Sequence, residues 1–414
     1  MPGFRFLHAA DIHLDSPLRG LRTRNEDAAR QFAAASRKAF SNLVDAAIAH
    51  EAAFVIIAGD LYDGDWKDYA TGQFFVREAG RLGRAGIRLF VIRGNHDAVS
   101  EISRSLPLPE CVHQFSTRKV ESVEIADLAV VLHGRSFAQR HVADNMAGGF
   151  PAARPGWCNI GLLHTSLTGR DGHDVYAPCS LEDLLRVGYQ YWALGHIHAR
   201  EIVHADPPVV FPGNLQGRHA RETGPKGATL VTVDNSGATK LEALDLDAAR
   251  WEIPSVDIAG LADEAALHDA VRAVLAPLAG ACEGRPLALR LRLTGATGLH
   301  ARLLAERERL TEDLQAVAST LSDRVYVEKL IVETRAPSAA RGLGLPLADL
   351  EEAFATAAAG PEFRHGLAAH LDLIRAKAPR EALEPGADID VETVLAQARE
   401  LIVSRLASGP GGER

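Results

Sequence analysis

Five short blocks of metal-binding residue types follow one another in the first half of the chain, most of them directly after an apolar run. They are Asp11–His13, Gly59–Asp63, Gly94–Asp97, His164 and Gly195–His198. One such block would carry little weight, because Asp-x-His occurs by chance. Five in order, each where a strand is expected to end, predict one shared site. Open α/β sheets build their sites just beyond the carboxyl ends of strands. The pattern therefore constrains the chain to a layered α/β domain around a metal centre.

Alternating strand and helix patterns extend over residues 1–246, as expected for such a domain. The continuous apolar run at 54–58 is typical of a strand that is covered on both faces. We predict further strands and helices from their periodicity: strands at 4–10 and 88–92, and helices at 25–50 and 69–82.

Two further segments follow this domain. Residues 247–340 combine helices with period-two strands, which predicts a small α+β module. Residues 341–414 are wholly helical in pattern. Three short amphipathic helices bury little core alone, so we expect them to pack on the chain or on a partner. A chain of 414 residues has room for two or three domains at ~150 residues each.

Composition excludes several classes of protein. No segment approaches the ~18 consecutive apolar residues of a membrane helix, and the first residues enter a strand without room for a removable signal. The four cysteines lie far apart with no Cys-x-x-Cys, which indicates a reducing compartment. We therefore expect a cytoplasmic protein without membrane association. The net charge of −9 disfavours a broad nucleic-acid-binding face, so any basic patch is expected to be local.

The blocks contain ligands for two divalent cations, the pair with which enzymes hydrolyse phosphate esters. Carboxylate, imidazole and amide oxygen together suit Mn²⁺, Fe²⁺ or Zn²⁺ better than Mg²⁺. Asp60 is the expected bridge, because its two oxygens can hold two ions. The remaining ligands divide into one set for each ion: Asp11, His13 and His198 for the first, and Asn95, His164 and His196 for the second.

His96 follows the ligand Asn95 and is expected to point elsewhere, as a proton donor to the leaving oxygen. Histidine suits this transfer because its ordinary pKa lies near 6.5. We expect Asp97 to accept the Nδ1–H of His96 and hold the ring. Asp63 either supports the ligands from behind or is an ordinary loop residue.

The chain resembles the calcineurin-like metallophosphoesterases, and within them the nuclease subunits of double-strand-break repair, the bacterial SbcD and eukaryotic or archaeal Mre class. Residues 8–17, 59–63, 94–97, 191–198 and 211–219 carry the resemblance. The block Phe211–His219, with residues 221–223 and 226–227, is especially similar to the YhaO-type bacterial branch.

This resemblance implies a four-layer β-sandwich flanked by helices over 1–246, and a small capping module over the DNA. It also implies two manganese ions, an activity that shortens DNA from 3′ ends, and an SMC-like ATPase partner. Some relatives have histidine where this chain has Asp63, which leaves the balance of exonuclease and endonuclease activity open.

A nuclease that tolerates any sequence is expected to contact the DNA backbone rather than the base edges. The residues that we expect to make these contacts are Arg218, His219, Arg221 and Arg93. Two other interpretations keep the same fold. One is a phosphoesterase for a small substrate, such as a cyclic nucleotide or a phosphomonoester, and the other is a scaffold without catalysis. Whether two chains pair as a homodimer is left open.

Overall fold

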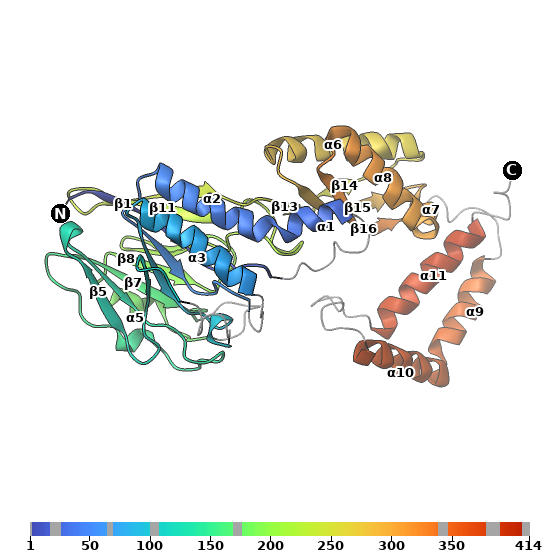
Figure 1. Ribbon diagram of the computed structural model, residues 1–414. Helices are drawn as coiled ribbons and strands as arrows, with labels where there is room; N and C mark the ends of the chain where they lie inside the picture. Colours follow the sequence, from blue (N-terminus) through green and yellow to red (C-terminus); the bar gives the residue numbers. More distant parts are fainter. Residues whose placement is uncertain are drawn as a thin grey trace. The chain divides into compact units, whose positions relative to one another are not determined.

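The computed structural model describes residues 2–16, 26–63, 69–99, 107–168, 176–337, 347–377 and 390–407. It divides into two compact units (Figure 1). The first contains residues 1–252 and 285–287, and the second contains residues 253–284 and 288–414. Among the described residues, no helix is both long enough and apolar enough to cross a membrane.

The first unit is built on two six-stranded sheets. The strands of the first sheet, in spatial order, are β12 (Thr239–Asp245), β11 (Gly227–Val233), β1 (Phe4–Ala9), β2 (Phe54–Ala58), β3 (Arg88–Ile92) and β4 (Val112–Gln114). The strands β1, β2, β3 and β4 are parallel, whereas β11 is antiparallel to β1. Every residue of β2 is buried, as the apolar run predicts.

The second sheet has a parallel centre of β6, β7 and β8. Its strands, in spatial order, are β5 (Glu121–Ile125), β6 (Val130–Gly134), β7 (Cys158–His164), β8 (Tyr191–Gly195), β10 (Pro208–Phe211) and β9 (Glu201–Ala205). The short helical elements of this half are α5 (Leu181–Leu185), η2 (Asp97–Val99), η3 (Ala126–Leu128) and η4 (Ala147–Gly149).

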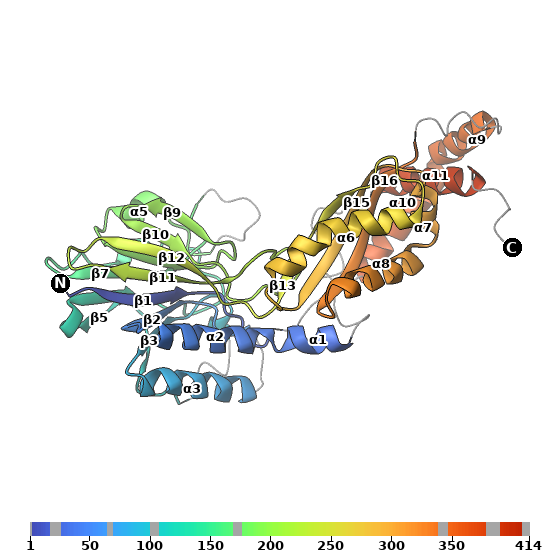
Figure 2. The same ribbon diagram turned by 90° about the horizontal axis from the view of Figure 1, so that it is seen from above.

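Apolar residues alternate along the strands and fill three layers of core. On β1, Phe6 packs between the two sheets while Leu7 faces the helices α2 and α3. A third cluster, with Trp192 and Phe150, lies on the outer face of the second sheet beside α5. Figure 2 shows α2 and α3 running along the first sheet. The order of helices, sheet, sheet and helix confirms the predicted layered fold.

The helix predicted over 25–50 is two helices, α1 (Glu26–Ala33) and α2 (Ala35–Ala49), and Asn25 lies outside the described residues. The interruption at Ala34 is slight. Its backbone keeps near-helical angles and still donates to the carbonyl of Arg30. The next helix, α3 (Tyr69–Arg84), begins where the periodicity predicts and ends two residues later.

The second unit begins after β13 (Arg250–Glu252) and is a small sheet with helices packed on it. Its elements are β14 (Ser255–Asp257), α6 (Glu264–Ala281), β15 (Leu287–Ala296), α7 (His300–Ala305), α8 (Arg307–Leu321) and β16 (Val325–Arg335). The strand β15 pairs with β14 in parallel and also with β16. Alternate residues Leu289, Leu291 and Leu293 are fully buried, while Arg290 pairs with Glu328 at 2.8 Å.

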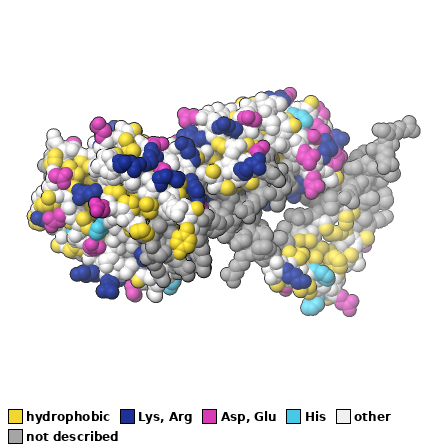
Figure 3. Space-filling view, viewed as in Figure 1, with side chains coloured by type: hydrophobic (Ala, Val, Ile, Leu, Met, Phe, Trp, Pro, Cys, Tyr) yellow, Lys and Arg dark blue, Asp and Glu magenta, His cyan; other side chains and the backbone are white. Residues whose placement is uncertain are grey.

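The helical end of this unit buries only part of its apolar surface. It consists of α9 (Leu347–Ala359), α10 (Pro361–Lys377) and α11 (Val391–Ala407), and α11 packs against α7. Leu371 and Leu395 are buried. Phe363, Leu373 and Ile374 on α10 are each more than half exposed, and Figure 3 shows hydrophobic side chains gathered over these helices.

Candidate metal centre

The expected ligands lie at one edge of the first unit, where parallel strands of both sheets end. Asp11 and His13 follow β1, Asp60 follows β2, and Asn95 follows β3. From the second sheet, the last residue of β7 is His164, while His196 and His198 follow β8. All seven side chains are buried except that of His198, which is 25% exposed, and that of His196, which is half-buried. Seven residues that span almost 190 positions are thereby placed in one cluster.

Four of the seven residues have left-handed backbone angles, which side chains other than glycine rarely adopt. The φ angles are 50° at Asp11, 44° at His13, 52° at Asp60 and 101° at His196. Such a residue costs about 1–3 kcal/mol and persists where the surroundings hold it. Here the amide of Asp11 donates to the carbonyl of Gly59, and that of His13 donates to the carbonyl of Asp60, both at 3.0 Å. Strain of this kind gathers at functional sites.

Two glycines allow the ligand segments to approach closely. A Cβ on Gly94 would lie 2.3 Å from Oδ1 of Asp60, and a Cβ on Gly195 would lie 2.0 Å from the carbonyl oxygen of Ala58. Neither distance is compatible with a side chain. The glycines of the motif blocks therefore permit the crossing of strand ends on which the site depends.

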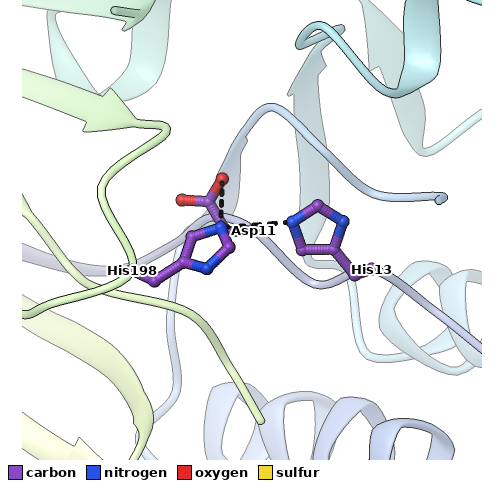
Figure 4. A group of neighbouring side chains, drawn as sticks. All are labelled: Asp11, His13 and His198. Atoms are coloured by element: carbon purple, nitrogen blue, oxygen red, sulfur yellow. Dashed lines mark hydrogen bonds and ion pairs between the residues drawn. The ribbon is translucent and has the colours of Figure 1, made fainter. Parts of the chain in front are cut away.

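The first ligand group consists of Asp11, His13 and His198, whose side chains point toward one another in Figure 4. Nε2 of His13 lies 3.3 Å from Nε2 of His198. The same nitrogen of His198 lies 3.9 Å from Oδ1 of Asp11. One atom from each residue can therefore bind a common ion.

The second group consists of Asp60, Asn95 and His164. Nε2 of His164 lies 3.0 Å from Oδ1 of Asn95 and 3.6 Å from Oδ2 of Asp60. That carboxylate oxygen is also 3.8 Å from Nε2 of His13, in the first group. Asp60 thus lies between the two groups, the position that the sequence assigns to a bridging ligand.

His196 completes the cluster from the side of the second sheet. Its ring lies edge-on to that of His164, with centroids 5.3 Å apart, and packs against Tyr176 at 5.2 Å. Its backbone amide donates to both carboxylate oxygens of Asp11, at 2.9 and 3.2 Å. His196 therefore links the two ligand groups through its backbone and its ring.

Electron pairs face each other in this cluster, which is the arrangement that a cation requires. Nδ1 of His164 donates to the carbonyl of Ala58 at 2.9 Å. Burial lowers the pKa of His164 to about 3, so the ring is neutral and its Nε2 carries a lone pair. That lone pair faces the acceptor oxygen of Asn95 at 3.0 Å, and no proton lies between them. The contact is repulsive unless a cation is bound, so the residues present fit a metal.

The buried carboxylates lead to the same conclusion. Burial, reinforced by the neighbouring charge of Asp60, raises the pKa of Asp11 well above its ordinary value. Burial likewise raises the pKa of Asp60, against the opposing charge of His96. Two buried carboxylates that resist ionisation side by side become stable as anions when cations bind between them.

His96 makes a different contact from the one predicted. Its Nδ1 lies 2.8 Å from Oδ1 of Asp63, not against Asp97. Ser16 donates to the other oxygen of Asp63 at 2.5 Å. Burial lowers the pKa of His96, but the hydrogen bond that its Nδ1 donates to Asp63 and the negative charge of Asp60 outweigh burial and raise that pKa. Asp63 therefore has the position that the sequence analysis gave to Asp97.

Asp97 instead stabilises the backbone beneath the site. Its Oδ2 accepts the amides of Leu61 and Gly94, both at 3.1 Å, and its Oδ1 accepts that of Tyr62 at 2.8 Å. Burial, with the charge of Asp60, raises its pKa to about 6. Its carboxylate is used in joining the second and third motif blocks, which is why it is not available to His96.

The four residues predicted to contact DNA lie in different surroundings. Arg218 is beside the metal ligands, with Nη1 3.9 Å from Oδ2 of Asp63. His219 neighbours Glu222, and Arg221 is exposed. The guanidinium of Arg93 lies against the amide of Gln114. In the orientation that satisfies both groups, the amide oxygen accepts from Nε at 2.9 Å and from Nη2 at 2.7 Å. Arg218 is therefore placed beside Asp63, the residue that contacts His96.

Glu222 is a site residue to which the sequence analysis gave no role. It is 7% exposed, and its Oε1 lies 2.7 Å from Nδ1 of His198. Burial raises the pKa of Glu222. The hydrogen bond from His198 and the charge of Arg218 outweigh burial and hold this pKa well below its ordinary range. The sequence contains two signals for this residue: its place in the segment 221–223 that resembles the YhaO-type branch, and its spacing of four residues from Arg218. Neither signal indicates a contact with His198.

Comparison with protein-family models matches two parts of the chain. Residues 4–200 match the calcineurin-like phosphoesterases. Residues 251–335 match the middle domain of the metallophosphoesterase YhaO. The first match ends just beyond the last of the seven ligands, and the second falls almost entirely within the second unit.

Individual relatives extend these matches. Over 316 residues, the chain is 34% identical to "Uncharacterized metallophosphoesterase YhaO" of Bacillus subtilis (strain 168), which covers 75% of this chain and 76% of the relative. It is 25% identical over 299 residues to "DNA double-strand break repair protein Mre11" of Methanopyrus kandleri, covering 65% and 62%. The protein of the same name from Sulfurisphaera tokodaii is 24% identical over 277 residues, covering 63% and 67%.

Proposed function

We propose that this protein cleaves the phosphodiester backbone of DNA with two divalent ions. The chain belongs to the calcineurin-like phosphoesterases, which are hydrolases of phosphoester bonds that use divalent metal ions. The single observation that carries the proposal is the cluster of the seven expected ligand residues, with Asp60 between its two groups. When bound, two ions orient a phosphate and lower the pKa of water toward ~7, which makes a nucleophile available at neutral pH.

His96 is the residue that we propose as proton donor to the leaving 3′ oxygen. Its Nδ1 is engaged by Asp63 at 2.8 Å, which leaves Nε2 as the nitrogen that can serve the substrate. The carboxylate keeps the ring oriented and favours its protonated form. A proton held at this nitrogen assists departure of an alkoxide, which is a poor leaving group.

Arg218 is the residue that we propose to contact the phosphate backbone near the scissile bond. Its guanidinium lies 3.9 Å from Asp63 and 3.5 Å from Glu222, so it is held beside His96 and His198. A guanidinium suits phosphate because its donors match two oxygens at once. His219, Arg221 and Arg93 are proposed as weaker backbone contacts, since Arg221 is exposed, Arg93 lies against the amide of Gln114, and His219 lies 3.6 Å from Glu222.

DNA is proposed as the substrate because two relatives carry the name of a double-strand-break repair protein. Cleavage from 3′ ends, manganese as the native ion, an SMC-like ATPase partner and a homodimer are part of the same proposal. The exposed apolar residues of α10, Phe363, Leu373 and Ile374, are compatible with a protein partner. The YhaO relative does not help to choose among substrates, because its name states none beyond a phosphoester.

Cleavage of end-labelled duplex and single-stranded DNA tests the proposal, with Mn²⁺, with Mg²⁺ and without metal. We expect cleavage of DNA with Mn²⁺ and none without metal. A para-nitrophenyl phosphomonoester and the corresponding diester are assayed beside it. Hydrolysis of the monoester with no cleavage of DNA would favour the small-substrate interpretation. Failure to bind any transition ion would favour the scaffold.

Two variants test the assigned roles. His96→Asn should keep both ions and lose cleavage of DNA, because it removes the proposed proton donor and none of the seven expected ligands. Asp60→Ala should lose both metal and cleavage, because it removes the bridge. Equal residual activity and equal metal content in the two variants would contradict the assignment.

A further inference from the structure

We propose that Glu222 is a positioning residue of the metal centre, which holds His198 in the one tautomer that can bind an ion and ties Arg218 to the same point. The inference rests on the proposed two-metal site and deepens it. It concerns a side chain outside the motif blocks that contain the ligands, on the segment between β10 and β11.

Among the described residues, each group that approaches the carboxylate of Glu222 is a hydrogen-bond donor. Oε2 accepts the backbone amide of Arg218 at 2.6 Å and Nδ2 of Asn214 at 3.0 Å. Oε1 lies 2.7 Å from Nδ1 of His198 and 3.6 Å from Nε2 of His219. A buried carboxylate satisfied in this way is fixed in place, because any rotation would leave both the carboxylate and its donors unpaired.

The contact with Glu222 decides which nitrogen of His198 carries the proton. An ionised carboxylate only accepts, so Nδ1 must donate at 2.7 Å. Nη2 of Arg218 lies 3.5 Å from the same nitrogen, which is too long to compete. Nε2 is then left with its lone pair, directed at Nε2 of His13 at 3.3 Å and toward Asp11. Glu222 thereby keeps His198 in the tautomer whose Nε2 can bind an ion.

Two ligands of the centre are oriented by similar means, but only one depends on a side chain that can be replaced. His164 is held by the backbone carbonyl of Ala58, which no substitution removes. His198 is held by Glu222. Carboxylates that orient metal-binding histidines in this way typically contribute 10- to 100-fold to metal affinity.

The same carboxylate connects the metal ligand to Arg218. It binds the backbone amide of Arg218 and lies 3.5 Å from its Nη2. The connecting turn is tight, since a Cβ on Gly217 would lie 2.7 Å from the carbonyl oxygen of Glu222. Loss of Glu222 should therefore loosen a metal ligand and the arginine together.

The variant Glu222→Gln tests the inference, because it keeps the size of the side chain and replaces one acceptor by a donor. Its amide nitrogen must face either His198 or the pair Arg218 and Asn214, and all of these are donors. Glu78→Gln is the matched control, since Glu78 is 5% exposed and pairs with Arg81 on α3 at 2.7 Å. Circular dichroism establishes that both variants are folded.

Binding of Mn²⁺ is measured by calorimetry and by electron paramagnetic resonance, without DNA. The wild type and Glu78→Gln should bind two ions and give the spectrum of a spin-coupled pair. Glu222→Gln should bind one of its ions about 10- to 100-fold more weakly and lose the coupled spectrum at limiting metal. Wild-type affinity and coupling in Glu222→Gln would overturn the inference. A wild type that binds no Mn²⁺ would instead refute the proposed function, and the inference with it.

Nitrogen NMR of the metal-free wild type gives a second test that does not depend on a variant. The histidine ring signals lost in a His198→Gln sample identify His198. We expect its proton on Nδ1. A proton on Nε2 would overturn the inference even if Glu222→Gln failed to fold.

Discussion

Replacing Asp63 with asparagine tests whether His96 is held for proton transfer. The substitution keeps the size of the side chain but removes the charge that lies 2.8 Å from Nδ1 of His96. The hydroxyl of Ser16, which donates to the second oxygen at 2.5 Å, can still donate to an amide oxygen. The amide nitrogen of the substituted side chain then faces His96, and the protonated form of His96 is no longer stabilised by a neighbouring carboxylate.

The expected loss follows from the strength of this contact. Both side chains are about three-quarters buried, with 27% of His96 and 21% of Asp63 exposed. A hydrogen bond to a charged group in such a place contributes about 1.5–3 kcal/mol. At 1.36 kcal/mol for each factor of ten, the rate of DNA cleavage should fall about 10- to 150-fold.

The pH dependence should change as well. Burial lowers the pKa of His96, but the hydrogen bond that His96 donates to Asp63 and the charge of Asp60 raise it above its ordinary value. A proton donor acts only while it is protonated, so activity is lost as the pH rises through that pKa. Removal of the Asp63 charge lowers the pKa, and the alkaline limb of the rate profile should move to lower pH.

The assay compares two substrates that differ in their need for a proton. One is a labelled DNA duplex, whose alkoxide leaves poorly, and the other is a bis-para-nitrophenyl ester, whose phenolate leaves readily. The wild type, Asp63→Asn, His96→Asn and the double variant are measured with saturating Mn²⁺. We expect a large loss on DNA, a small loss on the ester and unchanged binding of two ions.

The double variant can refute the proposal that Asp63 acts through His96. If Asp63 acts through His96, its substitution should cost little more once His96 is already asparagine. An equal loss from Asp63→Asn in the wild-type and His96→Asn backgrounds would show that the two residues act independently. The same conclusion would follow from an equal loss on both substrates.

Three further outcomes are expected. Gly94→Ala places a Cβ 2.3 Å from Oδ1 of Asp60 and should abolish binding of one or both ions by calorimetry, whereas Gly148→Ala, with no atom within 4 Å, should leave binding unchanged. Burial lowers the pKa of His8 from 6.5 to about 3, so the folded protein holds this ring neutral while the unfolded chain protonates it below pH 6.5. The stability that the buried neutral ring contributes is therefore complete above pH 6.5 and is lost as the pH falls toward 3. Urea denaturation should show a loss of about 2 kcal/mol from this residue between pH 7 and pH 5, which His8→Gln removes. Deletion of residues 342–414 should leave hydrolysis of the bis-ester unchanged, because the seven expected ligands all belong to the first unit, and a parallel loss of metal or activity would contradict that.

The layered fold could be predicted because its signals are local. The run at 54–58 is apolar throughout, and β2 is buried throughout. Along β1, Phe6 and Leu7 face different cores. The break at Ala34 between α1 and α2 was not predicted, since the periodicity on both sides of it is continuous.

The partners of the carboxylates could not be predicted in the same way. Asp97 and Asp63 both lie within a few residues of a ligand, and sequence spacing favours Asp97 as the partner of His96. The structure reverses this because Asp97 accepts the amides of Leu61 and Tyr62, which approach from another strand end. Which donors surround a carboxylate depends on chain segments far away in sequence.

The order of the motif blocks after apolar runs was by itself enough to indicate the layers, the edge at which the site lies and the residue types that surround it. Periodicity and residue chemistry are properties of short segments, so they can be recognised in the sequence without the structure. The direction of each electron pair was decided only by tertiary structure. Glu222 lies 24 positions from His198, and Ala58 lies 106 positions from His164. Contacts between such distant segments form when two sheets pack, and it is these contacts that determine where each proton and each lone pair lies.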